Sequence, residues 1–401
     1  MQAKLTQNNI PKGWQIKQIK DLLDYERPDK YIVESDRYLK SGTPVLTANK
    51  SFILGYTDEK SGIYNNLPAI IFDDFTTDSK LVDFPFKVKS SAIKILREKN
   101  KEIDLRFVYE KMKSINFPTG NHKRYYISQY QNMEILIPSF NEQTIISEIL
   151  NAVNDQIQKT DEIIFLTEKL KRNLMQKLFT KGIGHIKFKK TKIGEIPETW
   201  PVLRLGDNVE FKNGFAFNSR SYSETGKILI RMSNISTTGE LNINDSNIKF
   251  IPESKYNELS EFQLRKGDLI MSMTDVTKEL AIIGRTAIID KNDSYILNQR
   301  VGRLRTSKNL NSIFLHYLTN SDFYLSKIHE KVTGSAQFNL STHDIKESLI
   351  PLPTINEQEK ISEILLSLDM KISINKNLKE KLFVLKKGLA QDLLTGKKRT
   401  V

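Results

Sequence analysis

The sequence predicts an α+β protein in which two β-containing domains are separated by two long antiparallel coiled-coil helices, as a pseudo-two-fold repeat. The first observation is a repeat without gaps, from NEQTIISEIL to LMQKLFT and from NEQEKISEIL to LAQDLLT, with copies 215 positions apart (141–180 and 356–395). The second is the pair IPKGW and IPETW, 186 positions apart (10–14 and 196–200). Because the two registers differ, the two domains differ in length, whereas the two helices match without a gap.

These landmarks divide the chain into five consecutive segments. They are a first domain at 1–140, a first spacer helix at 141–182, a linker at 183–195, a second domain at 196–355, and a second spacer helix with a basic tail at 356–401. A chain of 401 residues is long enough for two domains that each bury a core.

The domain segments contain short β-rich runs separated by Gly, Asn, Asp and Ser turn signals. The predicted strands lie at 44–47, 51–54, 69–72, 228–230, 268–271, 281–283 and 286–289. Helical stretches are predicted at 103–113 and 310–332. The order of strands in each sheet does not follow from one sequence.

The spacer segments show helical spacing of apolar residues. The predicted stripes are Ile149, Val153, Ile157, Ile163, Ile164, Leu166, Leu170, Leu174 and Leu178, then Ile361, Leu365, Leu368, Ile372, Leu378, Leu382, Leu385, Leu389 and Leu393. Asn141 and Asn356 are the expected N-caps, and Gly182 and Gly396 mark the ends. At about 38 residues each, or roughly 55–60 Å, these helices need a partner, and we expect them to pair with each other.

Composition indicates a polyanion as the partner. The net charge is +13, with +5 on residues 1–140, zero on 141–182, +4 on 183–355 and +4 on 356–401. The chain contains no cysteine, which excludes disulfides and thiolate metal sites. It shows no apolar run long enough to span a bilayer and no secretory h-region, so a cytoplasmic location is expected.

Catalytic motifs are weak. Asp73, Asp74 and Asp78 lie close to Lys80, as in a metal-dependent nuclease, but the spacing is too short for a second strand and has no counterpart in the second copy. The five histidines lack metal-ligand spacing, and no P-loop is present. We therefore expect no catalytic residue, no metal site and no cofactor in this chain.

The polar residues of the two domains are the predicted DNA contacts. In the first domain they are Thr76, Thr77, Ser79, Lys80, Lys87, Lys89, Asn121, His122, Lys123 and Arg124. In the second they are Arg231, Ser233, Asn234, Lys278, Arg285, Asn298, Gln299, Arg300, Arg303, Gln337 and Asn339. Arg pairs with guanine and Asn or Gln with adenine at base edges, whereas Lys, Ser and Thr more often hold phosphates.

Together these motifs resemble the specificity (S) subunits of type I restriction–modification systems, the HsdS family. The resemblance rests on the repeated IPxxW and on NEQ…ISEIL, on IS (127–128) or LS (340–341) after a TG or GS turn, and on the ending LLTGKK (393–398). It also rests on KGDLIMSMTD (266–275), LNQRVGRLR (297–305) and FDDFTTDSKLVDFPFKVKSS (72–91). One departure is the loop TGNHKRYYIS, where the second copy has TGSAQFNLS.

The resemblance implies a non-catalytic adaptor with two target-recognition domains, each binding one half of a split double-stranded DNA site. The helices would set the gap and dock two methylation (M) subunits, which carry S-adenosylmethionine and methylate adenine at N6. Restriction (R) subunits, which use ATP and Mg²⁺, would complete the assembly.

Two alternatives from other classes remain open on the residues alone. One is a metal-dependent nuclease that uses Asp73, Asp74 and Asp78, and the other is a coiled-coil scaffold whose domains bind only proteins.

Overall fold

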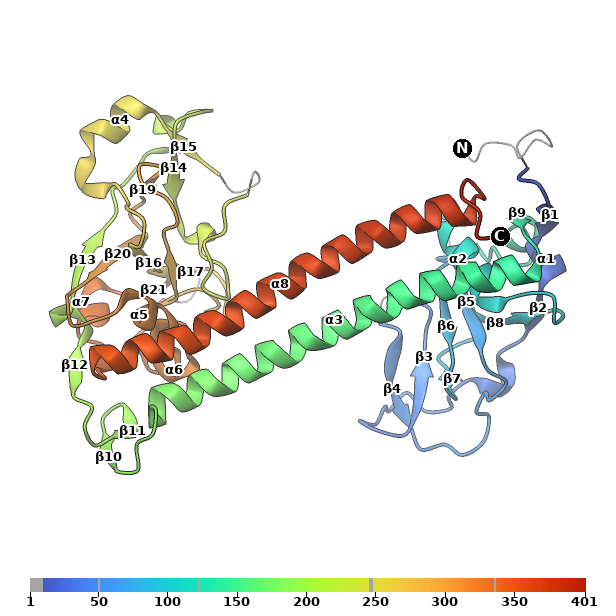
Figure 1. Cartoon of the computed structure of the whole chain (residues 1–401). Coiled ribbons are helices and arrows are strands. Elements are labelled where there is room, and N and C mark those ends of the chain that lie inside the picture. The colour runs from blue at the N-terminus through green and yellow to red at the C-terminus, as the bar shows by residue number, and fades with distance from the viewer. Residues whose placement is uncertain (1–9, 50, 121–122, 245–247, 335–336) are drawn as a thin grey trace. The chain divides into compact units, whose positions relative to one another are not determined.

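The computed structural model of the chain describes residues 10–49, 51–120, 123–244, 248–334 and 337–401 (Figure 1). The chain divides into two compact units, the first of Met1–Asp161 with Lys376–Val401 and the second of Glu162–Asn375. The division falls inside both long helices, α3 (Phe140–Lys181) and α8 (Ile355–Leu394). Each unit therefore contains one β-rich domain and a part of each long helix.

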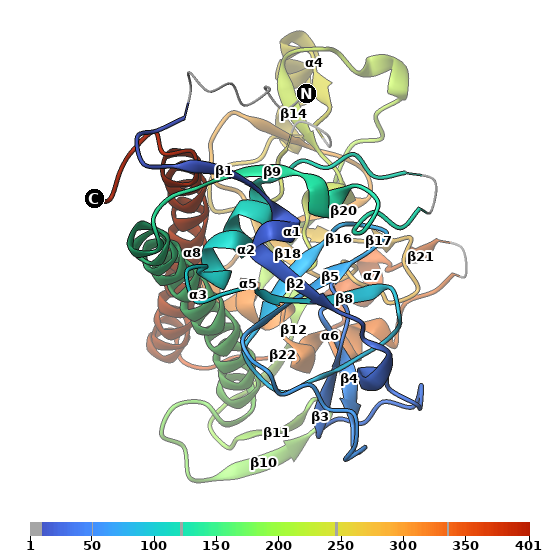
Figure 2. The same cartoon turned by 90° about the vertical axis from the view of Figure 1, so that its right-hand side faces the viewer.

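Within its described residues, the first unit contains three small sheets. The first two are the four-stranded antiparallel sheet β2-β8-β5-β6 and the three-stranded sheet β4-β3-β7, in which β3 and β7 are parallel; the third is the pair β1-β9. The strands are β1 (Gln15–Gln18), β2 (Leu23–Glu26), β3 (Thr43–Leu46), β4 (Ile53–Thr57), β5 (Ala69–Asp73), β6 (Ser79–Val82), β7 (Lys87–Val88), β8 (Ile93–Glu98) and β9 (Glu134–Ile137). Helix α2 (Leu105–Ser114) packs between the larger sheet and the long helices, and α1 (Ile19–Leu22) joins β1 to β2 (Figure 2).

The second unit repeats this plan. Its sheets are ordered β13-β20-β16-β18, β15-β14-β19 and β12-β22, with β14 and β19 parallel. These strands are β12 (Val202–Arg204), β13 (Val209–Asn213), β14 (Lys227–Ile230), β15 (Phe250–Ile251), β16 (Leu269–Ser272), β18 (Thr286–Ile288), β19 (Tyr295–Leu297), β20 (Val301–Thr306) and β22 (Leu349–Pro351).

The second unit also has elements of its own. They are the hairpin β10 (Phe188–Thr191) and β11 (Gly194–Pro197), the pair β17 (Thr274–Asp275) and β21 (Phe338–Asn339), and the helices α4 (Glu253–Glu258), α5 (Ser312–Thr319), α6 (Asp322–His329) and α7 (Thr342–Lys346). Thus the predicted mixed class with two long helices is confirmed, and the equal strand order in the two units is what the repeat required.

Segments of α3 and α8 lie side by side and antiparallel in each unit. In the first unit Lys379 forms an ion pair with Asp161, and in the second Lys171 Nζ lies 2.5 Å from Asp369 Oδ1. At 42 residues, α3 is about 63 Å long. None of the helices in the described part of the chain is both long and apolar enough to cross a membrane.

The predicted apolar stripes split into two faces. Ile157 and Ile164 are buried in the seam, where Thr160 and Thr167 continue the helical spacing. The prediction that Ile163, Leu166 and Leu170 belong to the seam is wrong, because all three are exposed. In α8, Leu378 and Leu385 are likewise exposed. Leucine spacing alone did not separate the seam from the solvent side, because small polar Thr side chains, which close a hydrogen bond on their own helix, fill seam positions.

The repeated NEQ residues attach each long helix to its domain. Buried Gln143 accepts the N–H of Asp104 at 2.9 Å and donates to the carbonyls of Glu102 and Pro138. Buried Gln358 does the same with the N–H of Asn311 and the carbonyls of Asn309 and Pro353.

Two of these partners are helix N-caps. Asp104 caps α2 and Asn311 caps α5, so each glutamine fixes the start of the helix that supports a domain. The long helices begin one residue before the predicted caps Asn141 and Asn356. In α3 the Oγ of Ser139 accepts the Glu142 N–H instead.

Candidate nucleic-acid interface

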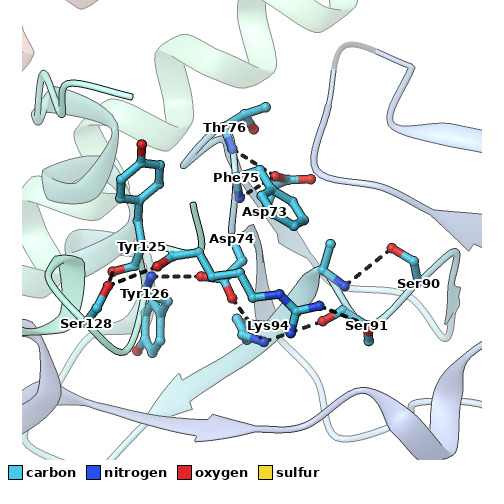
Figure 3. A network of polar contacts seen from close by, with 12 residues as sticks. Asp73, Asp74, Phe75, Thr76, Ser90, Ser91, Lys94, Tyr125, Tyr126 and Ser128 are labelled. Carbon is cyan, nitrogen blue, oxygen red and sulfur yellow. Dashed lines mark hydrogen bonds and ion pairs between the residues drawn. The ribbon is translucent and has the colours of Figure 1, made fainter. Parts of the chain in front are cut away.

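The first predicted contacts lie on the turn between β5 and β6, which Asp73 shapes. Its Oδ1 accepts the N–H groups of Phe75 and Thr76, both at 2.9 Å (Figure 3). Thr77 has a left-handed φ of +59°, and Thr76 is exposed. The turn therefore presents hydroxyl side chains to solvent at the end of the central strand.

Asp74 joins three segments of the first domain. Its backbone N–H donates to the Ala92 carbonyl at 2.9 Å, and its carbonyl accepts the Tyr125 N–H at 2.9 Å. Its buried carboxylate accepts the Tyr126 N–H at 2.8 Å and lies 3.2 Å from Lys94 Nζ. The β5–β6 turn, the segment before β8 and the loop ending at Tyr126 are thereby held together (Figure 3).

Arg124 lies at this junction. Its guanidinium is 5.7 Å from the centre of the Phe75 ring, and its Nη2 is 3.5 Å from the Ser91 hydroxyl. Lys123 and Arg124 are exposed, so both cations remain accessible to a polyanion. Asn121 and His122, predicted as contacts in the same loop, lie outside the described residues.

Met273 forms the same junction in the second domain. Its N–H donates to the Arg300 carbonyl at 3.1 Å, and its carbonyl accepts the Leu340 N–H at 2.9 Å. Met273 follows β16 as Asp74 follows β5, and these two strands hold the same place in their sheets. The shared contacts are made by the backbone, which explains why an aspartate and a methionine can occupy equivalent positions.

Several predicted contacts gather at this second junction. Gln299 and Arg300 are exposed on the turn before β20, and the Asn298 side chain holds that turn by accepting the Gln299 N–H at 2.9 Å. Asn339 lies on β21, where it pairs with Thr274 of β17, and Gln337 directly precedes this strand. Hydrogen bonds join the two residues to each other.

Lys278 is exposed on the loop that follows β17. Asp275 closes this loop by accepting the N–H groups of Thr277 at 2.8 Å and of Ile282 at 2.7 Å. Burial opposes ionisation of Asp275, but these backbone hydrogen bonds hold its pKa below the ordinary value. The carboxylate is thus a structural acceptor that shapes the loop.

Four predicted contacts have polar groups engaged inside their own domains. Lys87 is 2% exposed, and its Nζ donates to the Ser61 carbonyl at 2.9 Å and lies 2.5 Å from Glu59, whose pKa the hydrogen bond lowers. Buried Asn234 accepts the Arg231 N–H and donates to the Asn242 carbonyl. The polar groups of both residues therefore serve contacts within the domains.

Arg303 is the third such residue. It is 3% exposed, and its guanidinium lies 2.6 Å from the Glu210 carboxylate and donates to the Glu261 carbonyl at 3.1 Å. Half-buried Arg285 similarly donates to the carbonyls of Ala281 and Asn320. Both residues stabilise their own domain in this structure.

The remaining predicted residues lie on β6 or after β7 and β14. Lys89 forms an ion pair with Asp36 and lies 5.6 Å from the Tyr38 ring centre. Ser79 is buried and Lys80 is half-buried on β6. Half-buried Arg231 and exposed Ser233 lie after β14.

Sequence patterns did not identify the joining residues themselves. The sequence marks Asp74 only as a nuclease-like carboxylate, and Met273 carries no polar signal. Their equivalence follows from the strand pairing, because each directly follows the paired part of a central strand.

The nuclease alternative finds no support at Asp73 and Asp74, whose buried carboxylates accept backbone N–H groups. Within the residues that the structure describes, no group of three or more His, Asp or Glu is placed to hold a metal ion. The carboxylates are thus part of the scaffold of the turn.

Comparison with known proteins identifies a family. The sequence model of the type I restriction modification DNA specificity domain matches residues 11–168 and 197–383. The MjaVIII specificity subunit of Methanocaldococcus jannaschii is 28% identical, over 97% of this chain and 94% of that protein. The EcoR124I/EcoR124II specificity subunit of Escherichia coli is 30% identical, over 86% and 84%.

The fold is also similar to a solved structure. The S subunit of a type I restriction–modification system from M. genitalium superposes with a TM-score of 0.63 at 18% identity, over 98% of this chain and 99% of that one. The family match covers both domains and most of both long helices. The chain therefore belongs to the type I restriction modification DNA specificity family and is the DNA specificity subunit of a system whose catalytic activities lie on partner subunits.

Proposed function

We propose that each β-rich domain reads one half of a bipartite double-stranded DNA site through the loops gathered at its junction. The observation that carries this proposal is the repeated backbone junction at Asp74 and Met273. Both domains use one scaffold to present loops of different sequence, which suits two readers of different half-sites.

The proposed contacts are the exposed or half-buried polar side chains at the two junctions. They are Thr76, Lys123 and Arg124 in the first domain, and Lys278, Gln299, Arg300, Gln337 and Asn339 in the second. Arg124 and Arg300 have the chemistry to pair with guanine, and Gln299, Gln337 and Asn339 with adenine. Thr76 and the lysines suit phosphates. The remaining predicted contacts, Asn121 and His122 among them, stay predictions.

We further propose that the long helices set the gap between the half-sites and dock two methylation subunits. The exposed residues Ile163 and Leu170 of α3 correspond, 215 positions on, to exposed Leu378 and Leu385 of α8. The apolar face of α3 thus lies in the second unit and that of α8 in the first. Repeated exposed apolar faces of this kind mark protein-binding surfaces. Two equivalent faces suit two copies of one partner.

The same proposal assigns chemistry to partners. S-adenosylmethionine would bind the methylation subunits, and ATP and Mg²⁺ would serve the restriction subunits, in the cytoplasm where the DNA lies.

Methylome sequencing tests the reading of half-sites. A host that carries this chain with its methylation subunit should show one bipartite motif, and replacing residues 15–135 with the matching segment of a relative should change one half-site only. A change in both half-sites would overturn independent reading.

Point variants locate the readers within that motif. Arg124→Ala should relax one half-site and Arg300→Ala the other, each by the 1–3 kcal/mol that a base-reading Arg contributes. Lys192→Ala, an exposed cation on the β10–β11 hairpin, is the matched control and should leave the motif unchanged. If the affinity of the chain for duplex DNA does not fall as the salt concentration rises, the protein-binding scaffold is favoured instead.

A further inference from the structure

A polar cluster in the second unit joins three helices. Lys171 of α3 lies 2.5 Å from Asp369 Oδ1 of α8, and the Tyr317 hydroxyl of α5 donates to Asp369 Oδ2 at 2.6 Å. The Lys171 ammonium also lies 5.2 Å from the centre of the Tyr317 ring. The single acid of this cluster therefore comes from the long helix, and the domain contributes a neutral donor.

A second cluster occupies the first unit. Lys386 of α8 lies 3.3 Å from Glu110 Oε1 of α2, and the Asn154 amide of α3 donates to the same oxygen at 3.2 Å. Glu110 is 7% exposed. Here the single acid comes from the domain helix, and the long helix contributes the neutral donor.

The two clusters occupy equivalent positions. Lys171 and Lys386 are 215 positions apart, as are Asn154 and Asp369, which is the register of the helix repeat. Glu110 and Tyr317 each lie six residues after the N-cap of their helix. Both clusters thus contain the lysine at the same repeat position. The acid lies on the long helix in the second unit and on the domain helix in the first.

The chemistry allows only two of the four combinations of these residues. Glu with Asn, or Tyr with Asp, gives one carboxylate for one partly buried ammonium. Tyr with Asn leaves the lysine without a counter-ion, and Glu with Asp crowds two carboxylates around one lysine.

Each cluster contains one lysine, one acid and one neutral donor. We propose that this composition determines which recognition domain is compatible with which part of the helix pair. A domain with an acid at the Glu110 position fits a long helix with Asn, and a domain with Tyr fits a long helix with Asp. The inference goes beyond DNA reading, because it predicts which domains can be exchanged between the two halves.

The test uses one substitution in two backgrounds of the full chain. In the native chain Asn154→Asp should lower the thermal midpoint of the first unit, because it adds a second acid beside Glu110. In a chimera whose residues 10–138 are replaced by a second copy of 196–353, the same substitution should raise the midpoint, because it restores the Tyr–Asp pair. We expect shifts of about 2–4 °C in opposite directions.

A double substitution provides a second test without a chimera. Glu110→Tyr should destabilise the native chain, and Asn154→Asp should recover at least half of that loss when combined with it. Gln158→Glu, which adds the same charge at an exposed site of α3, should have one small effect in all backgrounds. If Asn154→Asp shifts the thermal midpoint by the same sign and size in every background, the proposal is overturned. If the chimera does not fold, the double substitution in the native chain decides.

Discussion

The indole N–H of Trp14 donates a hydrogen bond of 3.2 Å to Oε2 of Glu142, across 128 positions of sequence. In the second unit the indole of Trp200 donates to Glu357 Oε2 at 3.0 Å. Arg399 pairs with the first carboxylate at 2.7 Å, and His185 lies 2.9 Å from the second. The repeated IPxxW and NEQ motifs are therefore two sides of one contact, which a basic side chain from beyond the end of the other long helix completes.

Removing the Glu142 carboxylate should lower the stability of the first unit. Glu142→Ala leaves the buried Trp14 N–H without its acceptor, which we expect to cost about 1–3 kcal/mol of unfolding free energy. The measurement is urea unfolding followed by Trp fluorescence in a Trp200→Phe background, where Trp14 alone reports. Glu148→Ala, exposed on the same helix, is the control. Equal midpoints for the two variants would contradict a structural role for the contact.

The glycines that end the long helices should not tolerate a side chain. Gly182 and Gly396 have φ of +61° and +71°, and an added Cβ would lie 2.6 Å from Trp200 and 2.5 Å from Pro11, respectively. We expect either substitution to Ala to destabilise its unit by more than 1 kcal/mol. Gly388→Ala, inside α8 with open space around it, should instead stabilise the chain by about 0.5–1 kcal/mol. A destabilising Gly388→Ala would show that helix propensity does not govern that site.

Lys111 should make stability depend on pH. Its Nζ donates to the Leu394 carbonyl at 2.6 Å at the end of α8, and burial lowers the pKa of its ammonium to about 8. In the unfolded chain that pKa returns to about 10.5, so between pH 8 and 10.5 the unfolded state binds more protons. Stability should therefore rise with pH in this window, by up to about 1.4 kcal/mol per unit.

The Lys111→Met variant isolates this contribution. The difference in unfolding free energy between the native chain and this variant should change in favour of the native chain as pH rises from 8 to 10.5. A difference that stays constant over this range would mean that Lys111 keeps an ordinary pKa in the folded state.

The helix pair should act as an adjustable spacer. Seven residues inserted into both helices, between Asp161 and Glu162 and between Asn375 and Lys376, preserve the spacing of the seam and add about 10 Å. We expect the gap in the methylated motif to grow by about three base pairs at 3.4 Å each, with both half-sites kept. Insertion into one helix alone should destabilise the chain, and an unchanged gap after the double insertion would contradict the spacer.

The sequence by itself determined the repeat and the helices. Residues of NEQ and IPxxW recur in constant registers because their side chains meet one another, and such contacts leave a trace in sequence. The mixed class followed from the short β-rich runs and from the long helical spacing of apolar residues. The exposed Ile163 and Leu170 show the limit of apolar spacing, because a partner-binding face and a buried seam have the same periodicity on a helix.

Only the tertiary structure decided which polar residues are available for recognition. Lys87, Asn234 and Arg303 have the side chains of DNA contacts, yet partners inside the domains engage them, and those of Lys87 and Arg303 are distant in sequence. Asp74 and Met273 were invisible as equivalents because their shared contacts are made by backbone groups, which every residue possesses. Side-chain chemistry can be inferred from a sequence, whereas burial and backbone pairing depend on chain segments that only folding brings together.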